Sequence, residues 1–143
     1  MAQSSFNQDK FTPTASQSLL YSDLFDNFVV HPELHDLVIK KNEDAVSQSI
    51  LNLILTNKYD RPFQPDIGGN LRNYLFEPIS SITQSGIQIE IENIIANHEP
   101  RAKLISVIAT PYEEQNAYAI TITFYIVNIN KPVTLSTILY RIR

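Results

Sequence analysis

The chain is predicted to fold as a single α+β domain, from the order of its elements, its length and its composition. Patterns typical of strands come first and last, and patterns typical of helices lie between them, so strands and helices do not alternate as a parallel α/β sheet requires. The 143 residues fit one domain, and a chain of this size buries roughly 68–70% of its unfolded surface without disulfides or metals.

Composition excludes several classes of function. The chain has no cysteine, which rules out disulfides, thiolate metal sites and cysteine nucleophiles. Its net charge is −4 and no cluster of Lys and Arg interrupts the acidic balance, which argues against binding nucleic acid. No apolar run approaches the roughly 20 residues of a membrane span, and the start lacks a signal-peptide profile. We expect a protein made and used in water.

Residues 1–18 are polar and are predicted to form a flexible arm ahead of one folded domain at residues 19–143. Phe6 and Phe11 are the large apolar side chains of this arm. Two interpretations are open: a frayed terminus, or an arm whose phenylalanines dock on a partner.

Two short strands are predicted next, at Leu24–Val30 and Leu37–Lys40. Pro32 lies between them and disfavours helix at the residue before it. A helix then follows from Asp44 to about Thr56, with Asn42 as its expected N-cap. Its apolar residues recur at helical spacing, and they are Val46, Ile50, Leu53 and Ile54.

Two further helices are predicted after an irregular segment, Asn57–Asn70, which carries two prolines and two glycines. Leu71–Phe76 fits one or two helical turns before a Glu-Pro pair closes them. Ser81 and Gln84 have the spacing of a capping box, which starts a helix that runs to about His98.

The last part of the chain is predicted to be a three-stranded antiparallel meander. Ala102–Ala109 is dense in Leu, Ile and Val, as in a largely buried strand, and Thr110–Asn116 reads as a turn. Tyr118–Ile126 has apolar residues at every even position, the period of a strand. Asn130–Pro132 is predicted to turn the chain into the last strand, Val133–Ile142.

No metal or phosphate site is expected. His31, His35 and His98 are scattered, and Pro32 breaks the helix that would align the first two. The Gly68–Gly69 pair lacks the lysine and hydroxyl of a phosphate-binding loop and is interpreted as a tight turn.

Catalysis by paired carboxylates lacks positive support. A glycosidase needs one carboxyl with a raised pKa facing a second carboxylate, and Glu77, Glu90, Glu92 and Glu99 are the candidates. Arg101 lies two residues from Glu99, and a nearby cation lowers a carboxylate's pKa, which is the wrong direction for a general acid. We predict no catalytic residue and no cofactor.

Two blocks of residues carry a resemblance to a known family. The first runs from Arg61 to Leu71 as R-P-F-Q-P-D-I-G-G-N-L and continues into L-F-E-P at Leu75–Pro78. The second is Glu99-Pro100-Arg101, at the junction of a helix and a strand. With the helix that ends in L-I-L-T-N, these blocks resemble the gene-25-like family of phage baseplate wedge proteins, to which the type VI secretion subunit TssE also belongs. The chain departs from many relatives at Asn57–Asp60, where they have a proline–glycine turn.

The resemblance implies a structural role and not an enzymatic one. It implies a subunit of a contractile-tail baseplate wedge in the virion, assembled in the host cytoplasm, that contacts other wedge proteins and the tail sheath. We expect no nucleic acid, membrane or small-molecule partner. Two alternatives are kept: a cell-wall glycosidase, after an old "lysozyme-like" label of the family, and the homologous type VI secretion subunit.

The resemblance makes Glu99, Pro100 and Arg101 the expected partner-binding residues. Pro100 ends the helix, and an extended chain across it would present the Glu99 carboxylate and the planar Arg101 fork together. The alternative is a helix stop with a solvated ion pair. A second set is expected to be structural first and interface second, with Phe63 anchored in the core: Arg61, Pro62, Phe63, Pro65, Leu75, Phe76, Glu77 and Pro78.

The last strand is further expected to lie at the edge of its sheet and to pair with a strand of the sheath. The rival interpretation is an edge strand that pairs with nothing.

Overall fold

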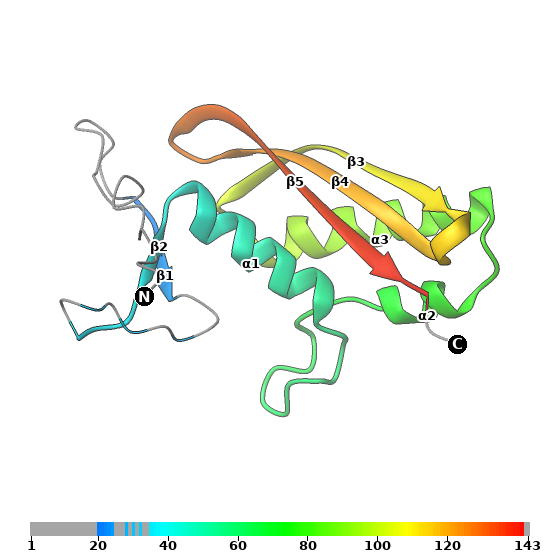
Figure 1. The fold of residues 1–143 in the computed structure, drawn as a ribbon, viewed down its shortest axis with the longest axis horizontal. Coiled ribbons are helices and arrows are strands. Elements are labelled where there is room, and N and C mark those ends of the chain that lie inside the picture. The colour runs from blue at the N-terminus through cyan, green and yellow to red at the C-terminus, as the bar shows by residue number, and fades with distance from the viewer. Residues whose placement is uncertain (1–19, 25–27, 29, 31, 33–34, 142–143) are drawn as a thin grey trace, which may run out of the picture.

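A computed structural model describes residues 20–24, 28, 30, 32 and 35–141. It confirms the α+β prediction, with a small strand pair, three helices and a three-stranded antiparallel meander (Figure 1). The elements are β1 (Ser22–Leu24), β2 (Ile39–Lys41), α1 (Glu43–Leu55), α2 (Leu71–Phe76), α3 (Ser81–His98), β3 (Ala102–Tyr112), a 3₁₀ turn (Glu113–Gln115), β4 (Ala117–Ile126) and β5 (Ile129–Tyr140).

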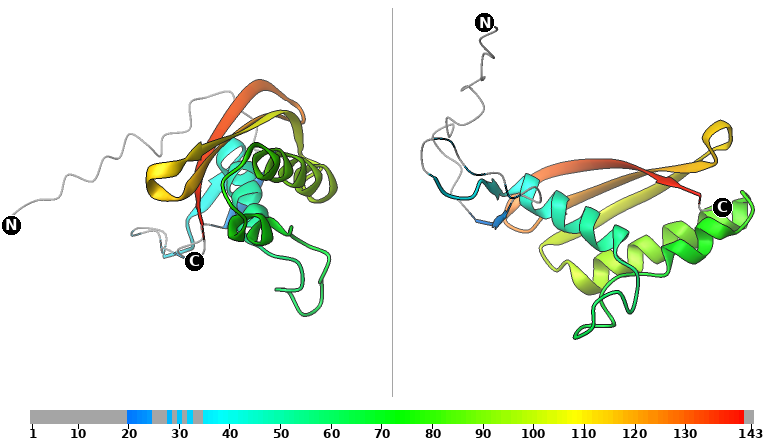
Figure 2. Two further views of the ribbon diagram at one scale, coloured as in Figure 1. Left: turned by 90° about the vertical axis from the view of Figure 1, so that its right-hand side faces the viewer. Right: turned by 60° about the horizontal axis from the view of Figure 1, so that its bottom comes forward.

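The core lies between the meander and the helices. The sheet has the order β3-β4-β5, and α1 and α3 lie along one of its faces (Figure 2). The even-numbered residues of β4 are all buried, which confirms the predicted alternation. They pack with the isoleucine face of α3, namely Ile87, Ile91, Ile94 and Ile95. No helix within the described ranges is long and apolar enough to span a membrane.

The predicted N-terminal strand pair exists, with described bounds shifted from the predicted ones, and residues 25–27 and 29 of the first predicted strand lie outside the described residues. β1 pairs with β2 from Ser22–Lys41 to Leu24–Ile39, and Val30 and Leu37 form only an isolated bridge. Asn42 explains this register, because its side-chain oxygen accepts hydrogen bonds from the amides of Leu20 (3.0 Å) and Tyr21 (3.3 Å). The prediction that this side chain caps α1 is therefore wrong.

The start of α3 also differs from the prediction. The capping residue is Ser80, whose hydroxyl accepts the Thr83 amide at 3.1 Å. Gln84 does not complete a capping box with Ser81, because its side-chain amide donates to the Ala109 carbonyl at 2.7 Å. A contact with the sheet has replaced a local one.

The first hairpin of the meander turns later in the chain than predicted, and the second turns earlier. β3 continues past Ala109 to Tyr112, because Pro111 lies at the sheet edge, where no ladder donor is needed. The second turn is made by Val127 and Asn128, and not by Asn130–Pro132. Asn128 has φ 70°, a left-handed conformation that asparagine tolerates.

The hydrogen-bond pattern tells which strand edges are open. The Arg141 amide donates to the Asn116 carbonyl at 2.8 Å, and the register runs regularly from Ala117–Tyr140 to Phe124–Val133. In an antiparallel pair, alternate residues bond to the partner strand, so the odd residues of β5 from 133 to 139 face β4. The amides of the even residues 134–140 point to the outer edge.

The same alternation on the other side of β4 makes Val107, Ala109 and Pro111 face the outer edge of β3. Pro111 has no amide hydrogen, the Ala109 carbonyl is taken by Gln84, and a bulge separates Leu104 from Ser106. The β3 edge is therefore interrupted, while no described residue pairs with the outer edge of β5 from residue 134 to residue 140.

Candidate functional site

The Glu99-Pro100-Arg101 block forms the turn between α3 and β3. The Glu99 amide still bonds the Ile95 carbonyl at 3.0 Å, and the Ala102 amide returns to the Glu99 carbonyl at 3.1 Å. Pro100 is the exposed residue of this turn. The prediction that α3 stops here is confirmed.

Glu99 and Arg101 form a bidentate ion pair. Arg101 Nε donates to Glu99 Oε1 at 2.7 Å and Nη2 donates to Oε2 at 3.0 Å. Only 3% of Glu99 is exposed. Burial alone would raise the pKa of Glu99, but hydrogen bonds from Arg101 and Ser49 and the charge of Arg101 hold that pKa below its ordinary value. The carboxylate thus faces its own arginine, and the expectation that it is presented outward is wrong.

Two residues of the N-terminal segment complete the surroundings of Arg101. Its Nη1 donates to Asp23 Oδ2 at 3.3 Å, and its guanidinium lies 5.7 Å from the centre of the Tyr21 ring. Asp23 and Arg101 are 78 positions apart, and no local pattern in the sequence connects them. Neither Asp23 nor Tyr21 was predicted from the sequence to lie at this site.

Arg101 lines an open hollow of about 350 Å³ between β1, α1 and the loop that joins α1 to α2. Asp23, Gln48, Asn52, Arg61 and His98 also line it. Arg61 of the first motif and Arg101 of the second therefore line the same hollow.

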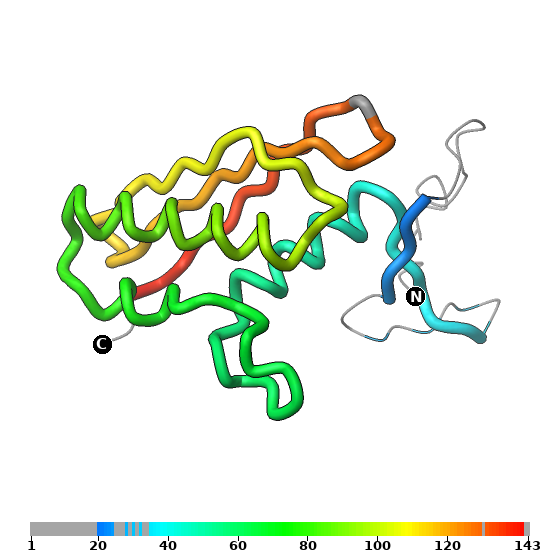
Figure 3. The backbone as a smooth tube through the Cα atoms, turned by 180° about the vertical axis from the view of Figure 1, so that it is seen from behind, coloured from blue at the N-terminus to red at the C-terminus, as the bar shows by residue number. Residues whose placement is uncertain are grey.

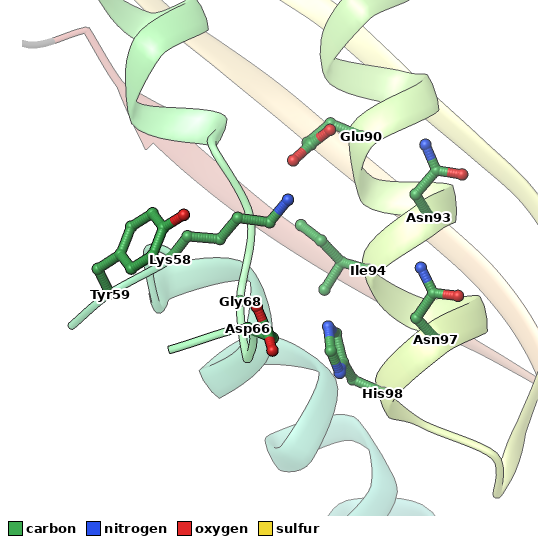
Figure 4. A pocket seen from close by; sticks show the side chains of 9 residues that line it. All are labelled: Lys58, Tyr59, Asp66, Gly68, Glu90, Asn93, Ile94, Asn97 and His98. Atoms are coloured by element: carbon green, nitrogen blue, oxygen red, sulfur yellow. The ribbon is translucent and has the colours of Figure 1, made fainter. Parts of the chain in front are cut away.

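A second hollow, of about 440 Å³, separates the same loop from α3 (Figure 4). Lys58 and Asp66 line it from the loop, and Glu90 and His98 line it from the helix. Glu90 accepts the Asn70 amide at 2.8 Å, so this carboxylate holds the loop to the helix. Across the described part of the chain, no three His, Cys, Asp or Glu residues are grouped to hold a metal.

The loop residues Arg61, Pro62, Phe63 and Pro65 are all exposed, on a segment that extends away from the body (Figure 3). Phe63 is 97% exposed, so the prediction that it anchors in the core is wrong. The apolar residues at the base of the loop, Ile67 and Leu71, pack there instead.

The L-F-E-P block lies at the start of α3, and the Glu99 turn lies at its end, roughly 27 Å away for 18 helical residues. Leu75 belongs to the core, while Phe76 is half-exposed. Glu77 and the Pro78 carbonyl both accept from the Thr83 hydroxyl, at 3.3 and 3.0 Å. This block supports a helix start and does not join the hollow at Arg101.

Residues 40–131 match the model of a protein family described as baseplate wedge protein gp25. The chain belongs to this family. The matched range contains both the loop at residues 57–70 and the Glu99–Arg101 turn, whereas Asp23 lies outside it.

Similarities to individual proteins and structures are consistent with this family membership. Baseplate wedge protein gp25 of Enterobacteria phage T4 is 30% identical over 84 residues, which are 59% of this chain and 64% of the phage T4 protein. A structure described as a putative tail lysozyme from Geobacter sulfurreducens has a TM-score of 0.68 and 26% identity, over 74% of this chain and 96% of that chain. A chain of the anti-feeding prophage baseplate shares the fold, with a TM-score of 0.60 and 23% identity over 85% of each chain.

Proposed function

We propose that this gp25-family protein is a structural subunit of a contractile-tail baseplate wedge, which joins other wedge proteins and starts the sheath. Its place is the tail baseplate of a phage or phage-like particle, reached by assembly in the host cytoplasm. Membership of the gp25 family and the phage T4 relative support this proposal.

We propose binding, not catalysis, even though one relative by fold is described as a putative tail lysozyme. A glycosidase needs a carboxyl whose raised pKa keeps it protonated. Glu99 is the buried carboxyl of the described residues, and its pKa is lowered by its ion pair. Its chemistry suits a permanent charge that holds an arginine in place.

The orientation of Arg101 is the observation that carries the proposed partner contact. Glu99 and Asp23 use three of the five N–H groups of the guanidinium, and Tyr21 packs near its face. Two N–H groups remain for an acceptor outside the chain, and the side chain is 27% exposed at the hollow. A fork fixed in this way binds a partner carboxylate or carbonyl with little loss of side-chain entropy.

Arg101→Lys tests this proposal, because it keeps the charge and removes the planar fork. We expect the purified variant to fold and to bind the reconstituted wedge subunits of the same particle at least about tenfold more weakly, as measured by calorimetry. Lys131→Ala is the control, since Lys131 makes only an exposed 3.5 Å pair with Glu43. Binding of Arg101→Lys at the wild-type affinity would refute the contact.

We also propose that β5 starts the sheath by strand addition. Its outer edge presents amides from residue 134 to residue 140, and the β3 edge is interrupted by Pro111, by Gln84 and by a bulge. A strand of the sheath protein would extend the meander beyond β5, with main-chain hydrogen bonds supplying affinity.

A further inference from the structure

We propose that Phe63 is the aromatic anchor of a second partner contact, inserted into an apolar pocket of a different baseplate protein that carries a carboxylate beside the pocket. This proposal rests on the proposed function, because it identifies a further contact of the same wedge subunit. It differs from the Arg101 contact in its residue, its chemistry and its experimental signature.

The exposure of Phe63 is the first argument. At 97%, its exposed fraction is the highest among the large apolar residues that the structure describes. A phenylalanine in water adds nothing to the stability of the monomer, whereas aromatic side chains dominate the energetics of interfaces. The position is therefore suited to a contact made outside the chain.

The loop that carries Phe63 is rigid, which is the second argument. The Gln64 amide bonds the Arg61 carbonyl and the Ile67 amide bonds the Gln64 carbonyl, each at 3.2 Å, so two four-residue turns follow one another. Pro62 and Pro65 occupy the second position of these turns, where the fixed φ of proline is favoured. The turns and the prolines restrict the shapes that the tip can adopt before a partner arrives, and preorganisation reduces the entropic cost of binding.

The base of the loop is fixed as well. The Tyr59 amide donates to the Pro65 carbonyl at 2.9 Å, and the Gly69 amide donates to the Thr56 carbonyl at 3.1 Å. Gly68 has φ 104°, and a Cβ there would collide with the Thr56 carbonyl. Only glycine allows the chain to return so closely to the end of α1.

The charges around the tip indicate the chemistry of the partner. The Asp60 carboxylate is occupied by the amide and side chain of Asn57, at 3.0 and 3.2 Å, and Asp66 lines the hollow against α3. Arg61 is exposed two residues before Phe63 and lines the hollow that holds Arg101. A partner that covers Phe63 would thus meet a positive charge and adjoin the proposed Arg101 contact.

A second copy of this chain is a poorer occupant. The apolar hollow on its own surface, beside Ile54 and Leu71, is flanked by Arg72 and by Asp60, whose carboxylate is already bonded. Arg72 repels Arg61 and Asp60 attracts it, so this hollow offers Arg61 no net attraction. We therefore assign the pocket to a protein of different sequence.

The test compares Phe63→Ala with Ile82→Ala, since Ile82 is 82% exposed on α3 and provides a matched apolar control. Thermal unfolding, sedimentation of the free protein, and affinity for the reconstituted wedge subunits are measured for both. We expect unchanged melting, a monomer in each case, and a loss of about 30-fold in affinity for Phe63→Ala alone. Phe63→Leu should lose less, because it keeps most of the apolar volume.

Each contrary result overturns the inference. Wild-type affinity of Phe63→Ala excludes the anchor, and a lowered melting temperature makes Phe63 part of the monomer. Self-association of the wild type that Phe63→Ala abolishes assigns the pocket to a second copy. If Arg101→Lys weakens binding and Phe63→Ala does not, the inference fails and the proposed function stands. If neither variant weakens binding, the proposed Arg101 contact fails too.

Discussion

The guanidinium of Arg101, at the start of β3, connects the end of α3 with the N-terminal segment. Glu99 holds it from the end of α3, and Asp23 and Tyr21 hold it from the N-terminal segment. Glu99 is nearly fully buried, so removing its charge would leave Arg101 without the partner that compensates its own desolvation. The pair therefore contributes to the stability of the monomer as well as to the proposed contact.

Glu99→Gln is expected to lower the free energy of unfolding at pH 7 by about 2 kcal/mol, below the 3–5 kcal/mol of a fully buried pair, because Arg101 is partly exposed. The pKa of Glu99 is lowered from 4.5, so its contribution is present above that pH and is lost as pH falls through the folded-state pKa. The difference between wild type and variant should shrink from pH 5 to pH 3.

Urea unfolding at several pH values measures the free energies of unfolding and tests this prediction. The exposed Glu114→Gln is the control and should show neither the loss at pH 7 nor the pH dependence. A destabilisation of Glu99→Gln that stays constant down to pH 3 would contradict an ionised, stabilising Glu99.

At the scale of elements, the helices could be predicted within about one residue because their signals are local. Apolar spacing defines α1 and α3, and Pro78 and Pro100 end α2 and α3. The predicted N-terminal caps of α1 and α3 were wrong because tertiary hydrogen bonds use the same side-chain atoms. Asn42 accepts amides about 20 positions away, and Gln84 reaches a carbonyl in β3.

The prediction of the candidate site was partial for the same reason. The sequence indicated Glu99 and Arg101 as a pair, because they flank a proline at an element boundary. It could not indicate Asp23, which meets Arg101 only through the pairing of β1 with β2. The position of Phe63 depends on whether a rigid loop turns toward the core or away from it, and the turn residues alone do not decide this.

The hydrogen-bond register of β5 makes the sheath proposal testable at one residue. The backbone amides of Leu135 and Thr137 point toward β4. A proline at either position would therefore remove a hydrogen bond within the hairpin and would not test the outer edge of β5. The backbone amide of Ser136 points to the outer edge of β5. Ser136→Pro should leave the fold and baseplate incorporation intact and prevent sheath nucleation, because it removes a donor that an added strand needs.

Electron microscopy of assembled tails measures that outcome, with Leu135→Pro as the structural control. Leu135→Pro should lose at least one ladder hydrogen bond and melt at a lower temperature. Sheath of normal length on a folded Ser136→Pro protein would exclude strand addition at β5.

At the scale of the molecule, the proposed contacts lie on different parts of one rigid core. The hollow at Arg101 and the loop of Phe63 lie beside α1 and the end of α3, and the open edge belongs to β5. A subunit arranged in this way can bind several neighbours without changing shape. The predicted arm, residues 1–18 with Phe6 and Phe11, lies outside the described residues and stays a prediction.

Deleting residues 1–18 tests the arm. The described contacts of the fold begin at Leu20, whose amide bonds Asn42, so the melting temperature should change little. Incorporation into the baseplate should fall, because two phenylalanines would no longer be buried against a neighbour. Replacing both by alanine in the full chain should reproduce the loss. Incorporation of the truncated protein at the normal level would leave the arm without a role.

The two outer edges of the meander differ, so a further strand could be added at one side of the sheet and not at the other. A chain with two open strand edges can add copies of itself without limit, as fibrils do. Here Pro111 and Gln84 interrupt the β3 edge, so the proposed strand addition is confined to β5. Under the proposed strand addition, the protein would begin a polymer of another protein and would remain at the end of that polymer.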